Sequence, residues 1–229
     1  MVDSLRDDVA LANRIAYREG LVTAFGHVSA RVPGTRSFLI PGRAAPMFAR
    51  PESLLRVDFD GNVVEGDAKP NTEMWIHARI YAARDDVGAV AHVHSPACVV
   101  VGQIGDTVLP LHNSGALVGQ VPVYRRAGLI RSRALGDAVA ETLGSSSTML
   151  LRGHGANVAE ADVRRAIVVA CLLEEAAALQ LRALAAAGGD AGRISFYDEE
   201  ENQRLAGELS GEPIARAWQY FAYRAESLV

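Results

Sequence analysis

Two histidines separated by one residue lie inside an apolar run, and they constrain the fold more than any other feature of the chain. His92 and His94 belong to segment 87–94, whose other residues are Val, Ala and one Gly. Side chains alternate between faces along a strand, so both imidazoles of a strand here point the same way. Such a pair is half of a divalent-metal site, although an isolated His-x-His pair is more often structural. The segment predicts a buried strand that carries two candidate ligands.

A third histidine, His154, lies between two glycines directly after the apolar run 148–151. Glu73 adds a carboxylate near the start of a predicted helix. Three protein nitrogens leave one coordination position open for water or substrate, as catalytic zinc requires. The joint pattern favours a catalytic metal site, whereas the alternative for His154 is a loop histidine bonded to the backbone.

Four segments of the chain resemble the class II aldolase and adducin family. They are Thr23-Ala-Phe-Gly-His-Val-Ser-Ala-Arg31, Lys69-Pro-Asn-Thr-Glu73, Ala89-Val-Ala-His-Val-His-Ser-Pro96 and Leu151-Arg-Gly-His-Gly-Ala156. The resemblance covers nearly the whole chain, and the four segments occur in the family's order. The resemblance implies that His92, His94 and His154 bind Zn²⁺, with Mn²⁺ or Fe²⁺ as alternatives. It also implies that Glu73 is the catalytic acid or base beside the metal.

Strands mixed with helices on one core indicate a single α/β (α+β) domain over residues 1–229. The resemblance implies a three-layer α/β/α fold of the class II aldolase type, in which the central sheet is mostly antiparallel. It also implies a homotetramer with active sites between subunits.

The periodicity of apolar residues predicts the individual elements. Helices are expected over residues 4–19, 72–83, 96–104, 133–143 and 162–187, and from residue 213 onward. Strands are expected over residues 28–32, 38–40, 54–59, 63–64, 87–94 and 148–151. Thr72 is the expected N-cap of its helix, and the polar segment 190–212 is expected to be mobile.

Composition excludes several classes of protein. The net charge is −4, the pI is about 5.9 and no cluster of Lys or Arg occurs, which argues against a nucleic-acid partner. The two cysteines suggest no disulfide framework, which favours a reducing cytoplasm. Apolar runs are too short to cross a membrane.

The residues expected to bind the substrate differ from those of sugar-phosphate members of the family. Those members carry Gly-Asn-x-Ser, a pair of serines and a Thr-Pro-Ser-Gly-like turn where this chain has Gly26-His-Val-Ser29, Asn71-Thr72 and Ile40-Pro-Gly-Arg43. The expected substrate contacts are His27, Ser29, Arg43, Asn71 and Thr72. They suit a planar carboxylate as well as a phosphate. The alternative for His27 is a loop histidine. The Gly-His-x-Ser variant resembles the branch that includes decarboxylases of dihydroxyaryl or keto acids.

Three further roles are open. Glu73 is expected to move a proton if burial raises its pKa, and the alternative is a carboxylate stabilised by the helix dipole. His77 lies four residues later on the same helix face, where it either braces the helix or joins the metal shell. The resemblance gives His112 a catalytic role in a neighbouring subunit's pocket, and the alternative is a loop histidine.

The predicted activity is that of a divalent-metal-dependent lyase that breaks a carbon–carbon bond through a metal-stabilised enolate. The favoured reaction is decarboxylation of a small anionic substrate, a non-phosphorylated hydroxyaryl or keto acid. Retro-aldol cleavage of a sugar phosphate, as in fuculose-phosphate aldolases, is the nearest alternative. A non-catalytic, adducin-like binding module and an iron-dependent oxygenase are alternatives from other classes.

Overall fold

The computed structural model describes residues 2–226 and contains eight strands. They are β1 (His27–Arg31), β2 (Ser37–Pro41), β3 (Leu54–Asp58), β4 (Val63–Glu65), β5 (Ala89–Val93), β6 (Val123–Tyr124), β7 (Thr148–Leu151) and β8 (Gly155–Glu160). Their order in the sheet is β4-β3-β2-β1-β5-β8-β7-β6. Neighbouring strands are antiparallel except β6 and β7. The predicted, mostly antiparallel central sheet is therefore confirmed.

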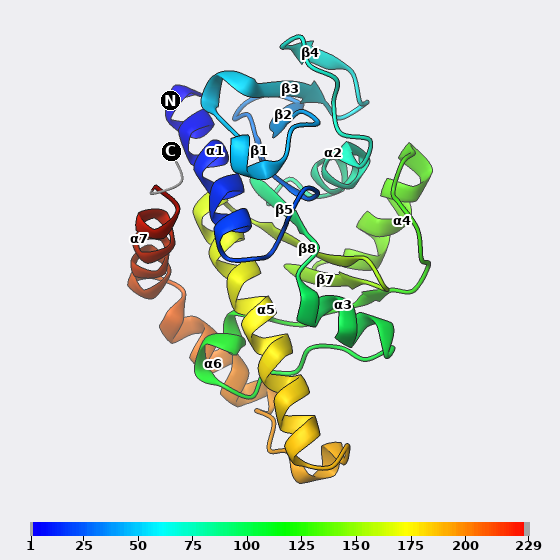
Figure 1. Cartoon of the computed structure of the whole chain (residues 1–229), viewed down its shortest axis with the longest axis vertical. Coiled ribbons are helices and arrows are strands. Elements are labelled where there is room, and N and C mark those ends of the chain that lie inside the picture. Colours follow the sequence, from blue (N-terminus) through cyan, green and yellow to red (C-terminus); the bar gives the residue numbers. More distant parts are fainter. Residues whose placement is uncertain (1, 227–229) are drawn as a thin grey trace.

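Helices cover both faces of this sheet (Figure 1). They are α1 (Val2–Arg18), α2 (Met74–Ala83), α3 (Pro96–Gln103), α4 (Arg133–Leu143), α5 (Val163–Ala186), α6 (Glu199–Leu209) and α7 (Glu212–Glu226). Short 3₁₀ turns are η1 (Pro46–Phe48), η2 (Pro51–Ser53), η3 (Asn113–Val118) and η4 (Ala191–Arg193). Within residues 2–226, no helix combines the length and the apolar character that a bilayer crossing requires.

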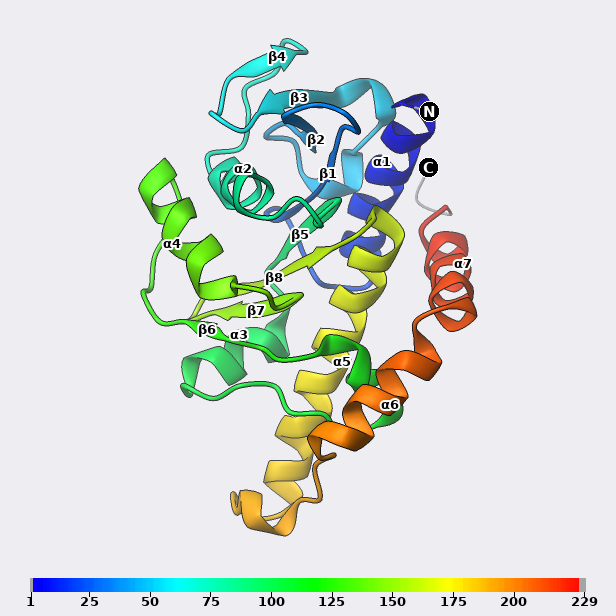
Figure 2. The ribbon, with the colours of Figure 1, turned by 180° about the vertical axis from the view of Figure 1, so that it is seen from behind.

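Each face of the sheet packs against its own apolar cluster. On β5, Ala91 and Val93 face the cluster formed with α1, α3 and α5, whereas Val90 faces the cluster formed with α2 and α4. This alternation is the expected consequence of strand geometry. Helix α7 lies outside α1 and α5, as the view from behind also shows (Figure 2). Polar side chains gather at the end of β5, on the side of the sheet that α2 covers.

Segment 190–212, which was expected to be a mobile segment, contains a regular helix, because residues 199–209 form α6. Asp198 and Glu201 make a reciprocal capping box at its start. The backbone N–H of Tyr197 donates to Pro110 O at 2.9 Å, and its hydroxyl donates to Asn113 Oδ1 at 2.8 Å. The polar composition of this segment reflects a capped surface helix.

The start of α2 also differs from the prediction. Glu73, not Thr72, occupies the cap position, and its side chain makes no capping hydrogen bond. Asn71 Oδ1 instead accepts the backbone N–H of Glu73 at 2.9 Å. The carboxylate of Glu73 is therefore free to turn toward the neighbouring strands.

Candidate metal centre and cleft

Three imidazoles and one carboxylate converge at the end of β5. His92 lies on β5 and His94 follows it, His154 lies in the turn between β7 and β8, and Glu73 precedes α2. The four atoms that these side chains offer to a metal lie within 4.8 Å of one another. We call His92, His94, His154 and Glu73 the histidine cluster. The structure thus brings together the three predicted ligands and the predicted acid or base.

Gly155 allows the turn that carries His154 to lie against the end of β5. Its φ is +154°, and a Cβ at this position would lie 2.0 Å from Val93 O and 2.9 Å from the Cα of His94. Because atoms cannot approach so closely, no other residue fits without a shift of the backbone. The glycine that flanks His154 therefore sets the close approach of two ligand segments.

His92 is oriented by a residue on the adjacent strand. The register of the sheet places His92 opposite Asn157 on β8. His92 Nδ1 donates to Asn157 Oδ1 at 2.8 Å, which leaves the lone pair of Nε2 directed at the cluster. Such a partner fixes the tautomer of a metal-binding histidine. Asn157 was absent from the sequence-based prediction, because its role depends on strand register.

The cluster holds buried nitrogens that the protein does not satisfy. His94 Nε2 lies 3.0 Å from His92 Nε2, and both ring nitrogens of His154 are buried without a partner. Glu73 Oε2 lies 3.6 Å from His154 Nε2 and 3.9 Å from His92 Nε2. Unpaired buried polar atoms are uncommon because they are costly. A divalent cation would satisfy these lone pairs, and imidazole with carboxylate is a donor set that suits zinc, manganese or iron.

The histidines of the cluster favour the neutral, metal-binding form. Burial, together with the neighbouring histidines, lowers the pKa of His92 well below 6.5. Burial and His154 lower the pKa of His94 to about 4. At neutral pH both rings therefore present lone pairs rather than charges.

Glu73 is ionised at neutral pH, which contradicts the expectation of a raised pKa. Burial raises its pKa, but the adjacent imidazoles of His154 and His92 and the backbone N–H of Ile130 lower it to about 2. The N–H of Ile130 donates to Glu73 Oε1 at 2.8 Å. The carboxylate can therefore accept a proton before it donates one.

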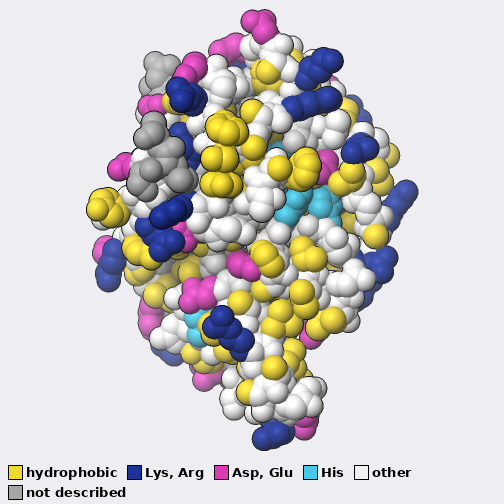
Figure 3. Space-filling view, viewed as in Figure 1, with side chains coloured by type: hydrophobic (Ala, Val, Ile, Leu, Met, Phe, Trp, Pro, Cys, Tyr) yellow, Lys and Arg dark blue, Asp and Glu magenta, His cyan; other side chains and the backbone are white. Residues whose placement is uncertain are grey.

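A cleft of about 560 Å³ opens over the histidine cluster. A group of histidine side chains reaches the surface on this face of the molecule (Figure 3). The lining residues are Ala24, Phe25, Gly26, Arg43, Ala44, Asn71, Thr72, Glu73, His94, Leu129, Arg131 and His154. Of the predicted substrate contacts, Arg43, Asn71 and Thr72 thus line the cleft.

The wall of the cleft combines apolar surface with positive charge. Phe25 is 69% exposed and Leu129 is 45% exposed. Arg43 and Arg131 are exposed guanidinium groups, and Arg43 Nε donates to Pro70 O at 3.1 Å. The sequence analysis did not identify Phe25, Leu129 or Arg131, because isolated loop residues carry no periodic pattern.

His27 and Ser29 lie behind the wall of the cleft rather than in it. His27 Nδ1 lies 2.7 Å from His77 Nε2, and Ser29 Oγ lies 2.6 Å from His77 Nδ1. Neither His27 nor Ser29 is among the lining residues. His77 is outside the histidine cluster, in agreement with its predicted role as a brace for the helix. Ser29 therefore supports its neighbours instead of contacting a ligand directly.

His112 lies away from the cleft of its own chain. It precedes η3, its ring lies beside Gly115, and both of its ring nitrogens are buried without a partner. Its predicted role in a neighbouring subunit's site stays a prediction.

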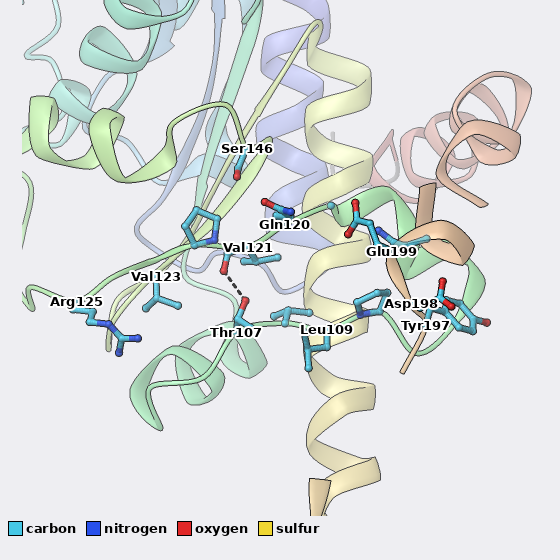
Figure 4. A pocket seen from close by; sticks show the side chains of 15 residues that line it. Thr107, Leu109, Gln120, Val121, Val123, Arg125, Ser146, Tyr197, Asp198 and Glu199 are labelled. Atoms are coloured by element: carbon cyan, nitrogen blue, oxygen red, sulfur yellow. Dashed lines mark hydrogen bonds between the residues drawn. The ribbon is translucent and has the colours of Figure 1, made fainter. Parts of the chain in front are cut away.

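A second cavity of about 500 Å³ lies between segment 107–125 and the start of α6 (Figure 4). Thr107 Oγ1 donates to Val121 O across its floor at 2.5 Å. Among the described residues that line it, none is a histidine or a cysteine, and none belongs to the histidine cluster. Of the two cavities, the cleft over the cluster is therefore the better candidate for catalysis.

Known proteins resemble this chain in both sequence and fold. A family model described as the class II aldolase and adducin N-terminal domain matches residues 7–181. A 3,4-dihydroxyphthalate decarboxylase from Rhodococcus jostii is 30% identical over 243 residues, which cover 99% of this chain and 98% of that protein. An aldolase II superfamily protein from Pseudomonas syringae is 28% identical with a TM-score of 0.84, covering 98% of this chain and 93% of that chain. An L-fuculose 1-phosphate aldolase from Glaciozyma antarctica shares the fold, with a TM-score of 0.84 and 23% identity over 99% of this chain and 90% of that chain.

Proposed function

The chain belongs to the class II aldolase and adducin family and is a carbon–carbon lyase, and we propose that it is a divalent-metal-dependent decarboxylase of a hydroxyaryl acid. One observation carries this proposal: buried imidazole nitrogens without partners lie at the base of a cleft with an apolar and cationic wall. The similarity to a dihydroxyphthalate decarboxylase over almost the whole chain supports it.

His92, His94 and His154 would hold the metal, with Glu73 beside it. When bound, a divalent cation supplies Lewis-acid stabilisation of the negative charge that develops as the carbon–carbon bond breaks. Zinc is the metal we propose first, and the same ligands also suit manganese and iron. Asn157 keeps His92 in the tautomer that can bind.

The cleft wall suits a planar aromatic acid. Phe25 and Leu129 offer apolar surface to a ring, and Arg43 and Arg131 offer guanidinium groups to carboxylates. Asn71 and Thr72 add polar contacts beside Glu73. A hydroxyaryl acid presents each of the groups that these side chains recognise.

Glu73 carries the proton in this proposal. Its carboxylate is ionised at neutral pH and is therefore available to accept the proton of a substrate hydroxyl. The bond between the ring carbon and the carboxyl carbon then breaks, and its electron pair stays on the ring while carbon dioxide leaves. Glu73 returns the proton to that ring carbon, so that charge and protons balance.

Retro-aldol cleavage of a sugar phosphate is the second candidate. The hydroxyl of Thr72 and the two arginines of the cleft also suit a phosphate group. A non-catalytic, adducin-like role is less well supported, because the complete set of metal-binding side chains is present.

We also propose that the protein acts in the cytoplasm as a homotetramer, with His112 contributing to a neighbouring subunit's cleft. Two free, buried cysteines agree with a reducing compartment.

The proposal is tested by loading the purified protein with zinc, manganese or iron(II) in turn and measuring carbon dioxide release. Candidate substrates are 3,4-dihydroxyphthalate, dihydroxybenzoates and keto acids, and aldehyde release from L-fuculose 1-phosphate is measured in parallel. We expect carbon dioxide from a dihydroxyaryl acid and none from protein with His154→Ala. Aldehyde without carbon dioxide would establish the aldolase instead. Tight metal binding with neither product would overturn both.

A further inference from the structure

The carboxylate of Glu73 meets different surroundings at its two oxygens. Oε1 accepts the backbone N–H of Ile130 at 2.8 Å in a buried contact. Oε2 lies 3.6 Å from His154 Nε2 and 3.9 Å from His92 Nε2, and both distances are too long for a hydrogen bond. One oxygen is therefore held by the backbone, whereas the other faces the imidazoles of the histidine cluster.

A tight turn makes the N–H of Ile130 available. The backbone N–H of Arg131 donates to Leu129 O at 3.2 Å, which closes a three-residue γ-turn around Ile130. Within residues 2–226, glycines alone have a positive φ, so the turn is of the common inverse type. The turn uses polar groups of its two outer residues and leaves the central N–H outside its ring, where Glu73 accepts it.

The same turn combines two residues of the cleft wall with a buried anchor. Leu129 and Arg131 are exposed and line the cleft. Ile130 lies between them, is 2% exposed and belongs to the apolar cluster on the side of the sheet that α2 and α4 cover. The buried side chain of Ile130 therefore fixes the backbone from which the two wall residues extend.

The two helices next to this hydrogen bond are in close backbone contact. Helix α2 begins directly after Glu73, and α4 begins at Arg133, three residues after Ile130. A Cβ at Gly136 on α4 would lie 2.4 Å from Trp75 O on α2, so only glycine permits this packing. The packing of α2 against α4 thus sets the distance between the donor and the carboxylate.

We infer that Ile130 is a positioning residue whose N–H holds Glu73 Oε1, so that Oε2 is the oxygen that transfers the proton. Oε2 accepts the proton of the substrate hydroxyl and later returns it to the ring carbon, while Oε1 keeps its hydrogen bond. Leu129 and Arg131 act on substrate binding instead. The assignment of the two oxygens rests on the proposed function, whereas the hydrogen bond does not.

The hydrogen bond is tested on zinc-loaded protein labelled with ¹⁵N-isoleucine, and this measurement needs no substrate. The Ile130 amide resonance is identified by its loss in Ile130→Val. We expect its hydrogen exchange to be about tenfold or more slower in wild type than in Glu73→Ala, because the variant lacks the charged acceptor. Glu73→Gln, whose amide oxygen can still accept, should give an intermediate rate. Equal rates in wild type and Glu73→Ala would overturn the inference.

The positioning role is tested by replacing Ile130 with its α-hydroxy acid analogue, which removes the N–H and keeps the side chain. The same replacement at Ile194 is the matched control, because the N–H of Ile194 donates to Ala191 O at the end of η4, outside the cleft. We expect the ester at position 130 to lower kcat by about 10- to 100-fold, with KM and zinc content within about threefold of wild type. The ester at position 194 should match wild type.

Leu129→Ala should give the opposite result, a KM about tenfold higher with little change in kcat, because it removes apolar contact with the substrate ring. The ester at position 130 also weakens Leu129 O as an acceptor for Arg131, and that effect would appear in KM. An unchanged kcat in this ester, or the same loss in both esters, would refute the positioning role. If wild type turns over none of the candidate substrates, the proposed function and the assignment of the oxygens fail together, whereas the exchange rate of Ile130 still decides the hydrogen bond.

Discussion

Two groups of buried polar side chains lie side by side in this protein and differ in how completely they are paired. We call Tyr81, Ser29, His77 and His27, whose side chains are hydrogen-bonded in that order, the buried row. The rings of His27 in the buried row and of His92 in the histidine cluster have centroids only 5.3 Å apart. Within the row, three contacts of 2.7, 2.6 and 2.8 Å join the polar atoms of neighbouring side chains. Within the cluster, both ring nitrogens of His154 have no partner. The Nε2 atom of His92 faces the Nε2 atom of His94. Burial alone is therefore a weak indication that a histidine binds a metal. A stronger indication is that several nitrogen lone pairs converge where no hydrogen-bond donor meets them.

The composition of each group explains the difference. Hydroxyl groups both donate and accept, so Ser29 and Tyr81 can complete a row that contains two imidazoles. The cluster instead combines imidazoles with a carboxylate that only accepts. The contacts of the row lie within the protein, whereas the cluster leaves lone pairs that a cation would satisfy. Four experiments separate the two groups, from the largest expected effect to the smallest.

Removing a ligand should have the largest effect. We expect His154→Ala to lose stoichiometric metal and to lower turnover by at least about a thousandfold, since even residues that only orient ligands are worth 10- to 100-fold. Metal content is measured by mass spectrometry beside a His112→Ala control, which replaces a histidine outside the cluster. Full metal content in His154→Ala would remove the distinction between cluster and row.

Glu73→Gln should separate metal binding from proton transfer. The amide keeps the size of the side chain but cannot accept the substrate's proton, so we expect kcat to fall by about 10²- to 10⁴-fold. The three imidazoles should still hold metal. Both quantities are measured on one preparation, and an unchanged kcat would show that Glu73 does not carry the proton.

Asn157→Ala should weaken metal binding without abolishing it. The substitution removes the acceptor that fixes His92, and we expect metal affinity to fall about 10- to 100-fold. Competition with a chromophoric chelator measures the change. Asn13→Ala is the matched control, because Asn13 is an equally buried asparagine that bonds Val28 instead of a ligand. Equal affinities in the two variants would contradict the orienting role of Asn157.

Acid should destabilise the metal-free protein through both groups. Burial lowers the pKa of His27 and His77 well below 6.5, and that of His94 to about 4. Below pH 6.5 the unfolded chain therefore binds protons that the folded chain does not, and stability falls as the pH falls. Each such histidine contributes about 1.4 kcal/mol per pH unit to the slope. Urea unfolding between pH 7.5 and 5.5 measures it. His94→Ala should reduce the slope by an amount that corresponds to about one proton. A free energy of unfolding that does not change with pH in the wild type would contradict the burial of neutral histidines in both groups.

The candidate ligands could be predicted from the sequence because local patterns mark them. Alternation along β5 places His92 and His94 on one face, and the glycines around His154 mark a close approach of backbones. The layered fold followed from the periodicity of the helices and from the family resemblance. These features depend on residues near one another in the chain.

What escaped prediction depends on long-range packing. Strand β8 is buried at every position and so lacks alternation, which concealed both the strand and its ligand-orienting Asn157. The pKa of Glu73 depends on the N–H of Ile130, a loop residue distant in sequence. Burial alone would raise the pKa of Glu73 instead of lowering it. Helix α6 escaped because its polar residues resemble those of a mobile segment.

The pairing of β5 with β8 has a consequence for how the protein folds. His92 meets Asn157 only in the finished sheet, and residues from positions 73 to 154 must come together before the cluster exists. Contacts of such long sequence separation form late, after the entropy of closing the intervening loops has been lost. During synthesis, the ribosome must release β8 before the cluster can assemble. We therefore expect the metal to bind a completed sheet, so that its supply governs how much enzyme is active rather than how fast the chain folds.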